Sequence, residues 1–173
     1  MLRFVHVPKT GGVALREALA PLGLGFACDG HLTTLASAQE ENIITIVRDP
    51  MDRYVSAFWW LATKTLWPWP SPDAMACRMG TTLVDNAFKR YMVLWRQTHW
   101  IDCERPFYWI GHTESLSDDA ARLGALLGLT VDIPRRNVGR YPPSPLSERA
   151  LANLHDFYAD DYELLRGASW LSK

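Results

Sequence analysis

The sequence predicts an α/β fold with a mostly parallel central sheet, and two observations lead to this prediction. The run at 43–47 is continuously apolar and rich in β-branched residues, as in a strand that is buried on both faces, and a buried strand is also expected at 3–7. Each run is followed by a helical pattern. Strands that alternate with helices favour a parallel sheet covered by helices on both faces, which is a three-layer sandwich. The length of 173 residues predicts one domain over 1–173.

The remaining elements follow from the same patterns. Asp49 before Pro50 is a typical helix start, and Gly128 is a typical helix stop. Strands are expected at 3–7, 24–28, 43–47 and 107–111, with a further candidate at 130–133. Helices are expected at 13–20, 33–41, 50–66, 81–97, 114–127 and 147–165.

The loop between the first strand and the first helix reads PKTGG, from Pro8 to Gly12. A glycine-rich turn of this kind presents backbone N–H groups at the positive end of a helix dipole, so it predicts a phosphate site. The lysine, Lys9, precedes the glycines, whereas it follows them in GxxxxGK[ST]. An ordinary ATP or GTP loop is therefore a poor match.

A second candidate anion site follows the strand at 43–47. Arg48 ends this strand, and Ser56 lies two helical turns beyond the expected helix cap Asp49, on the same face. We expect Arg48 and Ser56 to reach one anion above the strand end.

Together the two motifs resemble the 5′-phosphosulfate and 3′-phosphate motifs of sulfotransferases, which use 3′-phosphoadenosine 5′-phosphosulfate (PAPS). The segment PFYWIGHTESLSDDAARLGALLGL, 106–129, resembles a strand–helix segment of the carbohydrate-type enzymes. IPRRNVGRY, 133–141, resembles the loop that closes over the nucleotide, and 155–165 resembles the usual C-terminal helix. The resemblance covers about residues 4–165. It is nearest to the glycosaminoglycan 2-O-sulfotransferases and their small bacterial or viral relatives.

The resemblance implies a fold like that of P-loop NTPases and a transfer of the sulfuryl group from PAPS to an acceptor hydroxyl, of a carbohydrate above all. Loss of the sulfuryl group would convert PAPS into adenosine 3′,5′-bisphosphate, and the resemblance implies no metal. Lys9 would also assist departure of the phosphate. The cofactor-binding residues that the resemblance implies are Lys9, Thr10, Gly11, Gly12, Val13, Ala14, Arg48, Ser56, Arg136 and Asn137.

The loop departs from the family pattern at Val13 and Ala14, where family members carry hydroxyl side chains. Each lost hydroxyl removes about 1.5–3 kcal/mol if it bonded a charged oxygen. We expect weakened nucleotide binding rather than none. His112 stands where an arginine is common.

The resemblance also implies a catalytic base. The 2-O-sulfotransferases place a catalytic histidine in a Gly–His turn after the second strand, and His31 occupies that position here in the string DGH. A lone histidine is more often structural, so the role of His31 depends on the resemblance. Asp29 is expected to orient His31 or to serve as the base instead. His6, inside the first strand, is expected to be a satisfied core residue.

Composition excludes several other classes. With 18 basic and 19 acidic side chains the net charge is −1, so there is no general attraction to nucleic acid or to an acidic membrane. The three cysteines lack metal-ligand spacing, and no signal peptide or membrane span is recognisable, so a cytoplasmic location is expected.

Two questions stay open at this level. Trp67 and Trp69, in a proline-rich loop, are either a stacking surface for a sugar or packing residues with a homodimer patch. A degenerate nucleotide-binding module and a P-loop-type nucleotide kinase are the alternative functions.

Overall fold

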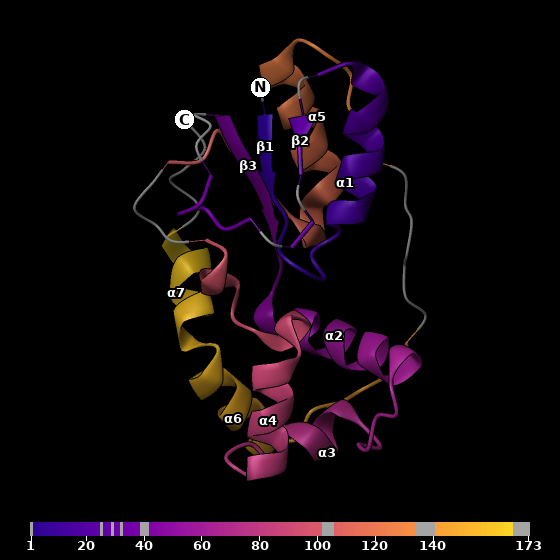
Figure 1. Ribbon diagram of the computed structural model, residues 1–173, viewed down its shortest axis with the longest axis vertical. Coiled ribbons are helices and arrows are strands. Elements are labelled where there is room, and N and C mark those ends of the chain that lie inside the picture. The colour runs from indigo at the N-terminus through magenta and orange to yellow at the C-terminus, as the bar shows by residue number, and fades with distance from the viewer. Residues whose placement is uncertain are drawn as a thin grey trace.

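The computed structural model contains one sheet, in which all strand pairs are parallel (Figure 1). The strand order is β2-β1-β3-β4. This confirms the predicted α/β class with a parallel sheet. The structure describes residues 2–24, 26–28, 30–31, 33–38, 42–101, 106–133 and 141–167. The strands are β1 (Leu2–Val5), β2 (Phe26–Ala27), β3 (Asn42–Val47) and β4 (Trp109–His112).

The elements of the described residues follow the expected order, with four changes and one addition, the short helix Pro72–Ala76, which was not expected. The strand expected at 130–133 is absent, because the chain there is irregular after the left-handed Gly128. The long helix expected at 147–165 is two helices, which meet at Tyr158. The α-helices are α1 (Gly12–Leu19), α2 (Pro50–Lys64), α3 (Pro72–Ala76), α4 (Thr82–Arg90), α5 (Leu116–Leu127), α6 (Glu148–Phe157) and α7 (Ala159–Gly167). Short 3₁₀ turns are η1 (Ala20–Leu22), η2 (Met92–Leu94), η3 (Gln97–His99) and η4 (Thr113–Ser115).

The third change concerns 81–97, where one helix was expected. The helix α4 ends at Arg90, because Tyr91 is extended, and η2 and η3 follow. The segment 92–99 can therefore turn back toward the sheet instead of continuing away along a helix axis.

Alternation along the strands sends side chains to two different cores. Leu2, Phe4 and Ile44 pack against α1 and α5 on one face of the sheet. Figure 1 shows these two helices together on the same side of the strands. Val5 and Ile43 pack on the opposite face against other parts of the chain, namely Leu35, Ala38, Trp100, Ile101 and Leu164.

The fourth change is at 33–41, where a helix was expected on this second face. The described residues 33–38 form a turn instead, in which the Leu35 amide donates to the Trp100 carbonyl at 2.7 Å. Irregular chain and one end of α7 therefore cover this face. The prediction of a three-layer sandwich with helices on both faces is not confirmed.

A helical half, made of α2, α3, α4 and α6, has its own apolar core and lies beyond one end of the sheet (Figure 1). Trp69 is buried in this core, and the Trp67 ring packs edge-on against Phe58 and Tyr91. The structure therefore favours the packing interpretation of both tryptophans over a stacking surface for a sugar.

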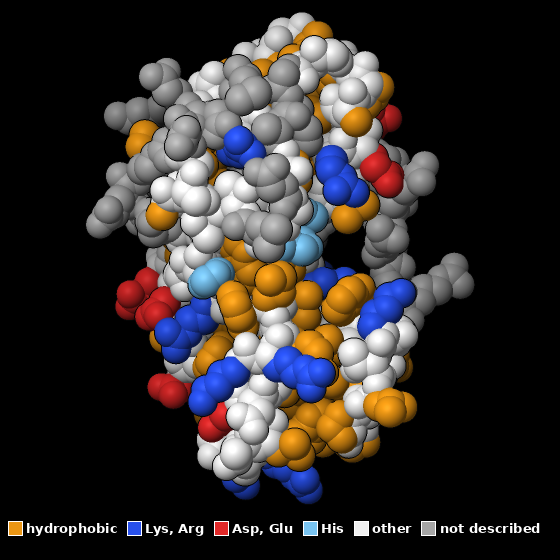
Figure 2. Space-filling model, viewed as in Figure 1, with side chains coloured by type: hydrophobic (Ala, Val, Ile, Leu, Met, Phe, Trp, Pro, Cys, Tyr) orange, Lys and Arg blue, Asp and Glu red, His pale blue; other side chains and the backbone are white. Residues whose placement is uncertain are grey.

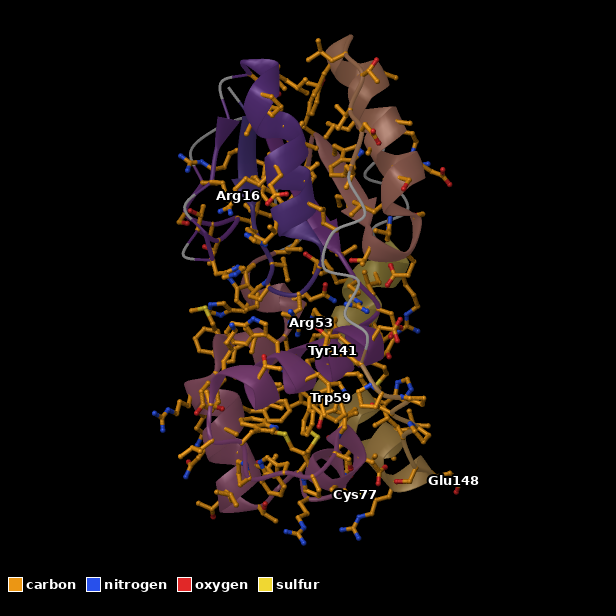
Figure 3. The ribbon with its side chains drawn as sticks, turned by 90° about the vertical axis from the view of Figure 1, so that its right-hand side faces the viewer. Arg16, Arg53, Trp59, Cys77, Tyr141 and Glu148 are labelled. Carbon is orange, nitrogen blue, oxygen red and sulfur yellow. The ribbon has the colours of Figure 1, made fainter. Side chains whose placement is uncertain are left out.

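A buried ion pair joins the helical half to the last helix. Arg53 of α2 and Asp161 of α7 are both fully buried and lie 4.0 Å apart. Figure 3 shows Arg53 at the level where the sheet and the helical half meet. The Arg53 guanidinium donates to the carbonyls of Val93 and Trp95, and the Asp161 carboxylate accepts from the amides of Gln97 and Thr98.

Burial raises the pKa of the Asp161 carboxyl and lowers that of the Arg53 guanidinium. The loss of hydration on burial has a larger effect on the pKa of each group than the attraction between the two charges, as is usual for a buried pair. The stabilising contribution of Arg53 and Asp161 therefore comes mainly from their hydrogen bonds to the segment 93–98, and less from the attraction between their charges. Its structural role is to fix the path of this segment.

We expect Asp161→Ala to lower the free energy of unfolding by about 3 kcal/mol or more, because the amides of Gln97 and Thr98 lose their acceptor and the buried Arg53 guanidinium loses its counter-ion. Asp160→Ala is the matched control, since this neighbouring carboxylate is exposed and pairs with Arg96 at the surface. The control should change the free energy by about 1 kcal/mol or less. Urea denaturation of both variants measures the difference, and equal losses would contradict the assignment.

Candidate functional site

The candidate site lies where the carboxyl ends of β1 and β3 face the helical half. The strand-end loop, residues 6–11, leads from β1 into α1, and Arg48 follows the last residue of β3. Ligands of open α/β sheets bind at this edge. Figure 2 shows histidine side chains at the level where the sheet and the helical half meet.

The carbonyl groups of the strand-end loop are bonded by side chains that come from several elements. The His6 carbonyl accepts from His31 at 2.9 Å, and the Val7 carbonyl accepts from the Thr10 hydroxyl at 2.9 Å. The remaining two bonds come from Arg48 to the Lys9 carbonyl, at 3.3 Å, and from Thr113 to the Thr10 carbonyl, at 2.7 Å.

These bonds determine which way the N–H groups of the loop point. In a planar trans peptide the N–H and the C=O point in opposite directions. Because the Lys9 and Thr10 carbonyls are directed at protein side chains, the amides of Thr10 and Gly11 point away from those side chains. The N–H groups of Gly12 and Val13 follow directly and have no partner within the helix, whereas the Ala14 amide donates to the Gly11 carbonyl. The loop can therefore offer several donors to one anion.

Two backbone features make the loop tight. Gly11 has φ of 89°, in the left-handed region that favours glycine. A Cβ atom on Gly12 would lie 2.3 Å from the imidazole of His6 and 2.8 Å from the ring of Phe4. Each glycine of PKTGG thus has a steric explanation, since Gly11 adopts a positive φ and Gly12 has no space for a Cβ atom.

Lys9 itself has φ of 68°, and no other described residue apart from glycines has a positive φ. This conformation costs about 1 kcal/mol or more in an L-residue and occurs often at functional sites. The ammonium lies 5.7 Å from the ring centre of Trp60, which is 38% exposed. Burial lowers the pKa of Lys9, and the nearby charge of Arg48 lowers it further.

The structure brings Lys9 and Arg48 together, as the bond from the Arg48 side chain to the Lys9 carbonyl shows. Within the described residues neither of these cations forms an ion pair with a carboxylate. Two like charges held side by side repel each other, and a bound anion would remove that repulsion. The arrangement is therefore suited to a phosphate or phosphosulfate group.

His31 is tied to the end of β1 from the neighbouring loop. A carbonyl can only accept, so His31 Nδ1 carries the hydrogen in its bond to His6. The other ring nitrogen, Nε2, then keeps its lone pair. Trp100 donates to the His31 carbonyl at 3.0 Å, which fixes the main chain as well. A neutral imidazole held in this tautomer is suited to accept a proton.

His6 is a buried core residue, as expected, but it is not satisfied. Within the described residues its Nδ1 has no hydrogen-bond partner. Its ring stacks on Phe4 and lies 4.2 Å from the ring of His31, centre to centre. Burial lowers the pKa of His6 to about 3, with smaller contributions from the charges of His31 and Arg16, so His6 is neutral near pH 7.

The other residues expected at the site differ in how well the structure places them. The Thr10 hydroxyl is buried and bonds within the loop. Ala14 is buried and its amide donates to the Gly11 carbonyl, whereas Val13 is half-buried in the first turn of α1. Ser56 of α2 is 5% exposed, and its hydroxyl forms no hydrogen bond within the described chain, with Arg48 or any other residue. Arg136, Asn137 and Asp29 lie outside the described residues.

Sequence reasoning missed the residues that support the site from a distance. Gln97 is fully buried and bonds the main chain of Arg48, and Thr113 bonds the loop. Such contacts between residues 49 or more positions apart leave no local pattern. Trp60 lies two residues after the buried Phe58, and nothing in the local sequence distinguishes its exposed ring from a buried one.

Two findings concern the wider chemistry of the chain. Across the parts of the chain that the structure describes, no three His, Cys, Asp or Glu side chains gather in a metal-binding arrangement. Among the described helices, none combines the length and the apolar character needed to cross a bilayer.

Comparison with known proteins gives one match. The model of a sulfotransferase family (Sulfotransfer_2) matches residues 30–166, which is more than three quarters of the chain. No curated protein and no solved structure matches. The matched range includes His31, Arg48 and Ser56, and the strand-end loop with Lys9 precedes it. A match of this extent, which takes in β3, β4, Arg48 and the helices from α2 to α6, means that the chain belongs to the sulfotransferase family.

Proposed function

We propose that the protein transfers the sulfuryl group of PAPS to an acceptor hydroxyl. The observation that carries this proposal is the pair of unneutralised cations, Lys9 and Arg48, beside the outward-facing amides of the strand-end loop. Two cations at one edge support a ligand with two anionic groups, such as a doubly phosphorylated nucleotide. The resemblance to the 2-O-sulfotransferases supports a carbohydrate as the acceptor class.

The residues present fit the nucleotide in two parts. Lys9 and the amides of Thr10 and Gly11 would hold the 5′-phosphosulfate, and Arg48 would hold the 3′-phosphate, with Ser56 as a second donor. When bound, PAPS supplies the sulfuryl group and leaves as adenosine 3′,5′-bisphosphate. Lys9 would stabilise the negative charge that develops on the departing phosphate, where a fixed donor is most effective.

His31 is the proposed base. Its Nε2 lone pair would take the proton of the acceptor hydroxyl while the oxygen forms its bond to sulfur. Its Nδ1–H stays bonded to the His6 carbonyl throughout, which keeps the ring in position.

We expect adenosine 3′,5′-bisphosphate to raise the melting temperature with EDTA present. At a ligand concentration 100 times the dissociation constant, binding adds about 2.7 kcal/mol of stability. For a chain of this size the shift is about 5–10 °C. Adenosine 5′-phosphate and ATP serve as comparison ligands. A melt that millimolar bisphosphate leaves unchanged would contradict the proposed site.

Arg48→Ala should remove most of the preference for adenosine 3′,5′-bisphosphate over adenosine 5′-phosphate. A charge-assisted hydrogen bond contributes about 1.5–3 kcal/mol, so the ratio of dissociation constants should shrink roughly 10- to 150-fold. Isothermal titration measures both constants. Arg90→Ala, on the exposed end of α4, is the matched control and should keep the wild-type ratio. If Arg48→Ala keeps it too, Arg48 does not bind the 3′-phosphate.

His31→Ala should lower turnover about 100-fold or more and leave nucleotide affinity nearly unchanged, because a general base acts on the acceptor and not on the phosphates. Lys9→Ala should weaken both binding and rate. The assay uses labelled PAPS with a panel of mono- and oligosaccharides. His155→Ala, an exposed histidine of α6, is the control. Near-normal turnover of His31→Ala would transfer the role to Asp29, and nucleotide binding without any turnover would favour a degenerate module.

A further inference from the structure

We propose that Gln97 is a positioning residue that sets the direction of the Arg48 side chain, and with it the selectivity for a 3′-phosphorylated nucleotide. The inference rests on the proposed function, because it takes Arg48 to be the group that holds the 3′-phosphate. It adds a residue that contacts neither the nucleotide nor the acceptor.

The contact between Gln97 and Arg48 is a pair of hydrogen bonds to one residue's main chain. The Arg48 amide donates to Gln97 Oε1 at 3.0 Å, and Gln97 Nε2 donates to the Arg48 carbonyl at 2.8 Å. Only one orientation of the side-chain amide allows both bonds, so the Gln97 amide group is locked. Gln97 is 0% exposed, so its side-chain amide is shielded from bulk water.

The two hydrogen bonds from Gln97 replace those that a neighbouring strand would make with the main chain of Arg48. β3 is a central strand, and its last paired residue is Val47, opposite His112 of β4. One residue later, Arg48 has no strand neighbour in register on either side. An unpaired buried amide or carbonyl is costly, and a chain end without such bonds is free to rotate. The Gln97 side chain therefore gives Arg48 the two main-chain hydrogen bonds that a paired residue of a neighbouring strand would give.

Gln97 is itself held firmly. Its own amide donates to Asp161 at 2.9 Å, and the Thr98 amide donates to the other oxygen of the same carboxylate at 3.0 Å. Arg53 bonds the carbonyls of Val93 and Trp95 just before it. The buried polar network thus ends on the main chain of Arg48.

The consequence concerns where the guanidinium lies. Arg48 touches the strand-end loop through a bond of 3.3 Å to the Lys9 carbonyl, which is long for a charged donor. That bond alone is a weak restraint on a long side chain. Fixing the peptide groups on both sides of the Arg48 Cα fixes the direction of its Cβ, so the guanidinium is already near the loop before a ligand binds.

The test is the ratio of dissociation constants for adenosine 5′-phosphate and adenosine 3′,5′-bisphosphate, measured by isothermal titration on Gln97→Met. Methionine keeps the length of the side chain and removes both hydrogen bonds. The ratio should fall about tenfold, with most of the change in the bisphosphate constant, because Lys9 and the loop amides are left in place.

Tyr158→Phe is the matched control. The Tyr158 hydroxyl is buried and donates to the Leu94 carbonyl at 2.7 Å, so its loss disturbs the same segment without touching Arg48. The control should lose stability and keep the ratio. If the ratio of dissociation constants falls to the same extent in Tyr158→Phe, the effect is structural and the inference is wrong.

A second variant keeps the test decisive if Gln97→Met does not fold. Gln97→Asn retains the amide but is one methylene shorter, so it cannot reach both groups of Arg48, and it should also lower the ratio. A wild-type ratio in whichever variant folds overturns the inference. A wild-type protein with no preference for the bisphosphate overturns the proposed function itself. Loss of preference in Arg48→Ala but not in the Gln97 variants overturns the role of Gln97 alone.

Discussion

The main chain beyond the ends of β1 and β3 must find hydrogen-bond partners without further strands, and the rest of the site depends on how this is done. Side chains supply the partners, from the loop after β2, from the segment 92–99, from η4 and from Arg48 itself. In the strand-end loop these bonds go to carbonyl groups, so the amides of Thr10 and Gly11 are directed away from the side chains that make them. The same requirement that stabilises the fold thus determines the sign of the charge that the site prefers.

Charge at this edge is arranged in two layers. The inner layer is the pair Arg53 and Asp161, where an acid and a base are both buried and bonded to the same stretch of chain. The outer layer is the pair Lys9 and Arg48, where two bases adjoin without an acid among the described residues. The inner pair holds the scaffold at a cost in hydration. The outer pair places two positive charges near each other, and a bound anion would relieve their repulsion.

Local pattern was enough to predict the parallel sheet, α1, α2 and α5, because buried strands and capped helices are encoded by neighbouring residues. Local pattern failed where distant residues decide. The helix expected at 33–41 is a turn because Leu35 bonds Trp100, and the helix expected at 81–97 stops at Arg90 so that Gln97 can reach Arg48. For the same reason the sequence indicated Lys9, Arg48 and His31 through their motifs but gave no sign of Gln97 or Thr113.

The position of Asp161 near one end of α7 has a consequence for synthesis of the chain. All the residues of the strand-end loop, together with Arg48 and Gln97, leave the ribosome before Asp161 does. Until that residue emerges, the amides of Gln97 and Thr98 have no acceptor and Arg53 has no partner. A nascent chain can therefore assemble its sheet early, yet the segment that bonds the main chain of Arg48 becomes fixed only after α7 has emerged and docked.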